Sequence, residues 1–183
     1  MGKYTIAKEL AKNYSFIICD NQLINNPIFE LLQYDGYAKI PDFSWNSIAK
    51  IRTEIFKFLT KVQGNDYVLT NCLGENLRDR KLYEQVKHMA EIRGSLFIPV
   101  RLLINKPVRL LINKDEHLKR LTQPKRRERW KSIDPKDAED KGPLLSISHP
   151  HFLEIEVSNL SPEGAAKAVM NHIIKVNSTI HTI

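Results

Sequence analysis

Residues 14–19 read YSFIIC and residues 66–71 read DYVLTN, and these two short runs decide the fold class. Both runs are mostly apolar and compact, as expected of a strand that is buried on both faces. Further strands are predicted in the apolar, β-branched segment from Leu96 and at residues 152–157, which read FLEIEV. Stretches with helical spacing separate these runs. Strands that alternate with helices predict an α/β domain with a parallel sheet.

The predicted helices are placed by the spacing of apolar residues and by the residues at their ends. They cover residues 2–13, about 44–62, about 75–92, about 115–121 and 164 to about 176. Residues 20–27 read DNQLINNP, a polar connection in which Pro27 could open the next helix. Ser161 and Pro162 are typical of the N-cap and the first position of the last helix.

The length and composition of the chain favour one domain over residues 1–183. The chain is 42% hydrophobic and 27% charged, which is enough for one ordinary core. Cys19 and Cys72 provide neither a disulfide framework nor a zinc ligand set, so we expect a reducing cytoplasm. No apolar run reaches about 18 residues, so we expect no membrane span. The net charge of +7 favours anionic partners.

An exact tandem repeat interrupts the pattern of strands and helices. Residues 99–106 and residues 107–114 both read PVRLLINK. Eight residues preserve the alternation of a strand, so either copy could fill the same place in a sheet. Sixteen residues are too many for one ordinary strand, and Pro107 cannot donate a hydrogen bond to a ladder. We therefore predict that one copy forms a strand and the other is extruded.

The N-terminal residues Gly2, Lys3, Tyr4 and Thr5 lead directly into an amphipathic helix. In a phosphate-binding loop, amides at a helix N-terminus bind phosphate oxygens, a lysine reaches the β and γ phosphates, and a hydroxyl holds magnesium. Taken alone, these four residues are more typical of a lysine-rich amphipathic helix that follows a start methionine.

Over nearly its whole length the chain resembles the P-loop kinase group related to shikimate kinase and gluconate kinase, especially small bacterial AAA-type ATPase-like proteins. The GKxT-type loop end of that group is matched by Gly2, Lys3 and Thr5. The lid of the group, expected at about residues 120–143, has a pattern matched in order by Arg120, Pro124, Arg126, Lys131 and Asp134-Pro135. The polar substrate loop of the group is matched by Asp20-Asn21-Gln22-Leu23 with Pro27. Its arginine before a strand is matched by Arg52, and its threonine at the end of that strand by Thr70. Its C-terminal LSPEEAA motif is matched by Leu160 to Ala166.

The resemblance implies a three-layer α/β fold of the P-loop type and a phosphotransferase that uses ATP with Mg²⁺ and a small hydroxylated acceptor. Lys3 would hold the β and γ phosphates within a loop formed by Gly2, Lys3, Tyr4 and Thr5, with Thr5 at the magnesium. Arg126, with Arg120 and Arg127, would stabilise charge from the lid. Asp20 would orient or deprotonate the acceptor, and the acceptor would contact Asn21, Gln22, Arg52 and Asn71.

Several of these residues have simpler roles that the sequence leaves open. Asp20 could only cap a helix, and Arg52 could form a surface salt bridge. Residues 125–131 could be a solvated or nucleic-acid-facing segment. Trp130 could stack on a base or pack the lid shut. The histidines at 88, 117, 149 and 151 form no convincing metal set.

The chain departs from the family pattern at its N-terminus. It starts at the second glycine of the loop, so we expect the first, central strand to be absent and two sheet edges to be left for pairing. Tyr4 stands where a complete loop has its magnesium-binding Ser or Thr. The alternative function is a non-catalytic basic α/β module that binds nucleic acid or other anions. Few aromatic residues lie near the basic run, so we do not expect nucleic acid as the partner. The pattern specifies neither the acceptor nor the oligomeric state.

Overall fold

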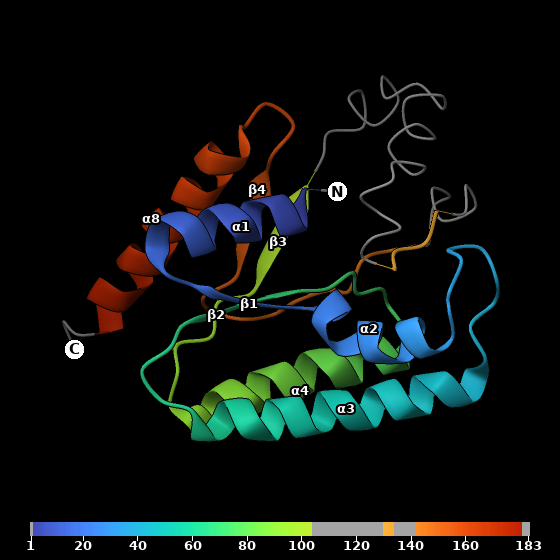
Figure 1. The fold of residues 1–183 in the computed structure, drawn as a ribbon. Helices are drawn as coiled ribbons and strands as arrows, with labels where there is room; N and C mark the ends of the chain where they lie inside the picture. Colours follow the sequence, from blue (N-terminus) through green and yellow to red (C-terminus); the bar gives the residue numbers. More distant parts are fainter. Residues whose placement is uncertain (1, 104–129, 134–141, 181–183) are drawn as a thin grey trace.

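The computed structural model describes residues 2–103, 130–133 and 142–180, which form a mixed α/β fold with short parallel strands (Figure 1). The second copy of the octapeptide and the predicted helix at about 115–121 lie outside the described residues. The described elements, in chain order, are α1 (Lys3–Tyr14), β1 (Ile17–Asp20), α2 (Asn21–Leu31), α3 (Asp42–Lys61), β2 (Tyr67–Thr70), α4 (Leu77–Arg93), β3 (Val100–Leu103), β4 (Leu153–Glu156) and α8 (Pro162–Ile180).

The four described strands form two parallel pairs rather than the one sheet that the sequence predicts. β1 pairs with β2 from Ile17↔Tyr67 to Asp20↔Thr70. β3 pairs with β4 from Val100↔Leu153 to Leu103↔Glu156. Among the described residues, no strand joins the two pairs, so β2 and β3 each keep one neighbouring strand. β3 comes from the first copy of the octapeptide, and the extrusion of the second copy stays a prediction.

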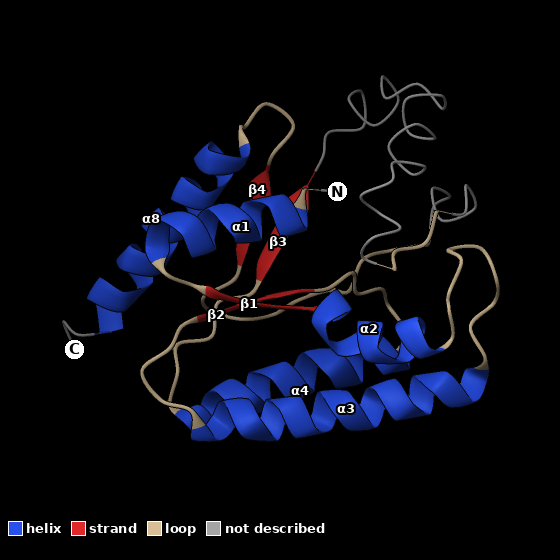
Figure 2. Cartoon of the chain, viewed as in Figure 1, coloured by secondary structure: helices blue, strands red, loops and turns tan. Residues whose placement is uncertain are grey.

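Helices cover both faces of the strands (Figures 1 and 2). On one face α1 packs against α8, and their buried side chains contact β2, β3 and β4 in one apolar cluster. On the other face α2, α3 and α4 pack together over a larger cluster that includes Cys19 of β1 and Leu69 of β2. The first cluster spans both strand pairs: Val68 comes from β2, and Val100 and Leu102 come from β3.

α1 forms because its apolar residues fall on one face and pack against the strands. Ile6, Ala7 and Leu10 are buried at helical spacing. The helix ends at Ser15, which has a left-handed backbone with φ 61°, and β1 follows within two residues. Because α1 packs on β1 and β2 and leads straight into β1, it runs back over the strands. Its N-terminus therefore lies toward the carboxyl ends of β1 and β2.

α2 corrects the prediction that residues 20–27 form a polar connection. The helix starts directly after β1, because the Asp20 carboxylate accepts a hydrogen bond from the Leu23 N–H and caps it. Pro27 lies inside α2 instead of opening a helix. Proline removes one helical hydrogen bond, and the buried Ile24 and Phe29 on either side of it hold the helix in place.

The predicted ends of two helices are confirmed. Gly94 closes α4 with a left-handed backbone at φ 66°, a conformation in which glycine carries no steric cost. The Ser161 hydroxyl accepts a hydrogen bond of 3.0 Å from the Gly164 N–H at the start of α8.

Among the described residues, none of the helices is long and apolar enough to cross a membrane.

Candidate functional site

The carboxyl ends of β1 and β2 bring several predicted site residues together. The register places Asp20, the last residue of β1, directly beside Thr70, the last residue of β2. Asn21 follows Asp20 in the chain, and Asn71 follows Thr70. Asn21 and Gln22 form the first turn of α2, and both are half-buried, as is Asn71. This is the edge of a parallel sheet at which ligands of α/β proteins bind.

Asp20 is the most buried of these polar residues, with 4% of its surface exposed. Its Oδ1 atom accepts the Leu23 N–H at 3.1 Å, which is a structural role as the N-cap of α2. The sequence left open a helix cap or a group that acts on the acceptor. The geometry supports the cap, and the catalytic role stays a prediction.

The N-terminus of α1 has the features of an anion-binding helix end. Gly2 precedes the helix with a left-handed backbone, φ 70° and ψ −22°, and its carbonyl accepts the Ile6 N–H at 2.9 Å. Gly2 has no side chain that could cap this end, and the first turn contains no acidic residue. The backbone amides and the positive end of the helix dipole therefore favour a phosphate group.

Lys3, Tyr4 and Thr5 occupy that first turn, and they differ in exposure. Lys3 and Tyr4 are half-buried, and Thr5 is exposed. The first-turn amides and the Lys3 ammonium are groups that can bind an anion. Among the described residues, no group of three or more His, Cys, Asp or Glu side chains could hold a metal ion. A magnesium ion here would depend on phosphate oxygens and on the Thr5 hydroxyl.

Lys131 is the described residue of the predicted lid that reaches α1. Its Nζ atom lies 5.2 Å from the centroid of the Tyr4 ring, which Lys8 of the same helix approaches at 5.6 Å. The positions of Arg120, Arg126 and Arg127 lie outside the described residues, so their lid role stays a prediction. Residues 130–133 nonetheless place one cation of the predicted lid beside the candidate phosphate site.

Arg52 lies half-buried on α3, close to a second arginine that the sequence analysis did not single out. Burial lowers the pKa of the Arg52 guanidinium, Arg78 lowers that pKa further, and Asp79 opposes both effects. The Arg52 Nε atom is buried and has no hydrogen-bond partner among the described residues. Arg78 stacks over the Trp45 ring at 4.9 Å. Arg52 is therefore not a surface salt-bridge residue in the described part of the chain.

The loop that follows β2 connects this arginine pair to the sheet edge. The Asp79 carboxylate accepts hydrogen bonds from the Gly74 N–H at 2.8 Å and from the Asn76 amide at 2.7 Å. These bonds within the loop hold in place the carboxylate that raises the pKa of Arg52. Nothing in the spacing of residues 71–79 could have revealed Arg78, because its closeness to Arg52 depends on how α3 and α4 pack.

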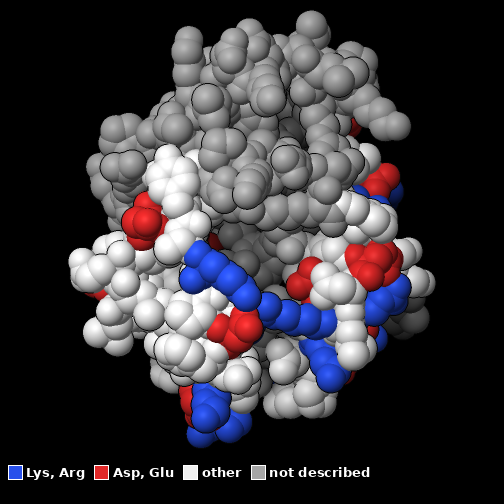
Figure 3. Space-filling model, turned by 90° about the vertical axis from the view of Figure 1, so that its right-hand side faces the viewer, with Lys and Arg blue, Asp and Glu red and all other residues white. Residues whose placement is uncertain are grey.

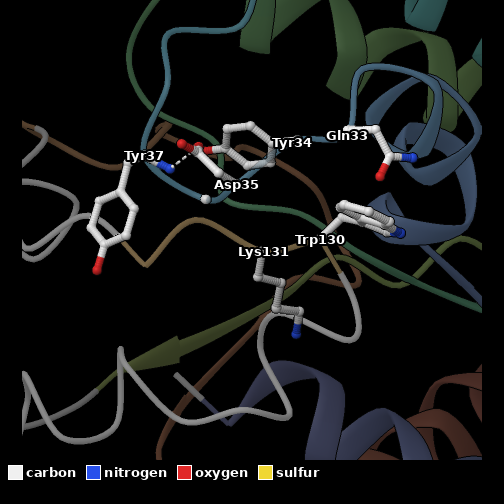
Figure 4. A pocket seen from close by; sticks show the side chains of 7 residues that line it. Gln33, Tyr34, Asp35, Tyr37, Trp130 and Lys131 are labelled. Carbon is white, nitrogen blue, oxygen red and sulfur yellow. Dashed lines mark hydrogen bonds between the residues drawn. The ribbon is translucent and has the colours of Figure 1, made fainter.

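A pocket of about 430 Å³ lies beside the segment that follows α2. It is lined by residues 33–37 together with Trp130 and Lys131. Three aromatic rings form much of its wall, and Figure 4 shows how these side chains surround it. Of these residues, the sequence indicated a role only for Trp130 and Lys131.

The face onto which the strand ends open carries a band of Lys and Arg side chains, with Asp and Glu side chains between them (Figure 3). This distribution agrees with the net charge of +7. A basic surface attracts anionic ligands, although it does not select among them.

Comparisons with known proteins support the fold. No family model matches the sequence, and no curated protein matches it either. Among solved structures, the chain is similar to one described as a "putative kinase" from Chloroflexus aurantiacus, with a TM-score of 0.61 and 15% sequence identity. The match covers 95% of this chain and 90% of that one. The chain therefore shares the mixed α/β fold of that structure.

Proposed function

We propose that this chain is a single P-loop kinase-like domain that transfers the γ phosphate of ATP to a small hydroxylated acceptor. One observation carries the proposal: the N-terminus of α1 combines a left-handed Gly2, Lys3 in the first turn and no acidic or capping side chain, at the carboxyl edge of the strands. The similarity to a structure described as a kinase is in agreement with this function.

The strand arrangement also supports a P-loop sheet. The two pairs are both parallel, and β2 and β3 pack under the same α1–α8 layer. Ile18 of β1 lines a surface pocket with exposed and half-buried residues of α1, so β1 lies at the outer side of its pair. The inner edges of β2 and β3 are then the two that a central strand would join. A strand that leads through a glycine-rich loop into Gly2 would complete a three-layer P-loop sheet at this position.

Each candidate residue has a role in this proposal. Lys3 and the first-turn amides would bind the β and γ phosphates and neutralise charge as it develops on the transferred group. Asp20 would hold α2 and orient the acceptor hydroxyl. Arg52 would bind an anionic group of the acceptor, and Asn71 would also contact the acceptor. Arg120, Arg126 and Arg127 would close the site from the predicted lid.

Calorimetric titration with magnesium-ATP tests this function on the chain itself. We expect binding that is lost in the Lys3→Ala variant and retained in Lys12→Ala. Lys12 is a matched control, because it is exposed in the last turn of the same helix, away from the candidate phosphate site. Equal binding by both variants would contradict a phosphate site at the N-terminus of α1.

The second candidate function is a basic module that binds nucleic acid, and the band of basic side chains is the observation that favours it. Such binding would fall steeply with salt and would be nearly unchanged in Lys3→Ala. Titration with a short duplex at two salt concentrations, using the same variants, distinguishes it from a kinase site.

A further inference from the structure

The pocket beside residues 33–37 has no role in the phosphate chemistry proposed above, yet its walls have a definite chemical character. The rings of Tyr34, Tyr37 and Trp130 line it, and Lys131 contributes a cation. Figure 4 shows Tyr34 and Asp35 along one side, Tyr37 at one end, and Trp130 with Lys131 toward the other end. A volume of about 430 Å³ lies within the range of small-molecule sites.

The backbone of the pocket is fixed on the side that follows α2. The Asp35 Oδ1 atom accepts hydrogen bonds from the Tyr37 and Ala38 N–H groups, both at 2.8 Å. The Gln33 amide donates to the Glu30 carbonyl at 2.9 Å. These two polar side chains therefore shape the turn, and the aromatic rings supply most of the wall for a ligand.

The opposite wall is docked onto the same turn. The Gly36 carbonyl accepts the Ile133 N–H at 3.0 Å and the Ser132 hydroxyl at 3.3 Å. Ile133 is completely buried against Gly36. Trp130 and Lys131 are thereby held against the turn. Lys131 lines the pocket, and its Nζ atom lies 5.2 Å from the centroid of the Tyr4 ring at the start of α1.

We propose that this pocket binds the planar aromatic base of a nucleoside monophosphate. Aromatic walls bind a flat ring through its π-face and its apolar area, whereas an open-chain polyol offers them neither. Lys131 supplies the positive charge that a phosphate group on the ligand requires. The inference rests on the proposed function, because it names the acceptor class for the same site: the ring lies in the pocket and its phosphate points toward α1.

Trp130 makes the test direct, because the chain contains only two tryptophans. In a Trp45→Phe background all tryptophan emission comes from the pocket. We expect saturable changes in that emission on titration with at least one of AMP, CMP, GMP and UMP, and none with gluconate or inorganic phosphate. Equal responses to gluconate or phosphate, or no saturable response to any nucleotide, would overturn the proposal.

Two exposed aromatic residues provide a matched pair of variants in that background. Tyr37 lines the pocket and is 49% exposed, whereas Phe43 is 68% exposed and lies outside it. Tyr37→Ala should weaken nucleotide binding about tenfold or more, and Phe43→Ala should leave it unchanged. Equal affinities for the two variants would place the base elsewhere. Because Tyr37 is about half exposed and Phe43 is more exposed still, neither variant should unfold the chain.

The base could belong to an acceptor or to ATP, and a competition experiment separates these sources. A non-hydrolysable magnesium-ATP analogue that leaves nucleoside monophosphate binding intact assigns the pocket to the acceptor, and displacement overturns that assignment. Lys3→Ala separates this proposal from the proposed function. If Lys3→Ala keeps magnesium-ATP binding while Tyr37→Ala loses nucleoside monophosphate binding, the proposed phosphate site is wrong and the base pocket is supported. If Lys3→Ala loses magnesium-ATP binding while Tyr37→Ala keeps nucleoside monophosphate binding, the phosphate site is supported and the base pocket is wrong.

Discussion

Substitution of Asp20 separates its structural role from its proposed catalytic role. The carboxylate is 4% exposed and accepts the Leu23 N–H at 3.1 Å as the N-cap of α2. Removing an N-cap acceptor costs about 0.5–2 kcal/mol, and a partly buried N–H left unpaired places the loss in the upper half of that range. We therefore expect Asp20→Ala to lower the free energy of unfolding by about 1–2 kcal/mol, equivalent to a fall of about 2–8 °C in melting temperature for a chain of this size.

The Asp20→Asn variant retains an oxygen that can accept the same hydrogen bond, and asparagine is as good an N-cap as aspartate. Its free energy of unfolding, measured by urea denaturation, should stay within about 0.5 kcal/mol of the parent chain. If Asp20 also acts on the acceptor, phosphoryl transfer should fall about 100-fold or more in this stable variant. Asp66→Ala, a change to an exposed aspartate before β2, is the control. Equal stability of Asp20→Ala and this control would refute the capping argument.

Three further predictions concern the loop, the cysteines and the response to acid. Gly36 has φ 91°, and a Cβ there would lie 2.7 Å from an Ile133 side-chain atom. Gly36→Ala should therefore lower the free energy of unfolding by about 1–3 kcal/mol in denaturant titration. It should also shift Trp130 emission to the red as residues 130–133 undock, and unchanged emission would contradict this. Cys72 is exposed, whereas Cys19 is buried, and burial and then Asp20 raise the pKa of the Cys19 thiol. A thiol reagent at pH 8 should therefore modify Cys72 quickly and Cys19 only in denaturant. Rapid modification of both cysteines in the folded chain would be evidence against it. Burial, and then the neighbouring His151, lower the pKa of His149. The unfolded chain therefore binds more protons at this position, so stability should fall as the pH drops below about 6.5, and it should fall less in His149→Gln. Identical profiles of stability against pH for the two chains would exclude His149 as the cause.

Local signals in the sequence predicted most helices and strands of the described fold. α1, α3, α4 and α8 and all four strands occur within a few residues of their predicted ranges, because their apolar spacing, caps and closing glycines are local features. α2 was missed because Asn-rich, polar residues are typical of turns. The Asp20 cap and the buried face of α2 outweigh that tendency.

The sequence predicted those site residues whose position depends on the order of strands along the chain. It did not predict those that come together only through packing between distant elements. Asp20, Asn21 and Asn71 were found because residues that directly follow parallel strands gather at one edge. Arg78 beside Arg52, and the aromatic pocket, arise from contacts between elements far apart in sequence. No spacing rule identifies such contacts.

We propose that β1–β2 and β3–β4 are the two halves of one P-loop sheet, with a strand position between β2 and β3. Amide hydrogen exchange in β2 and β3 tests it most directly, measured on the chain and on a variant extended before Gly2 by an apolar strand and a glycine-rich loop. We expect the extension to slow exchange in both strands, because a central strand would pair with both inner edges. Slower exchange in only one of the two strands, or in neither, would contradict it.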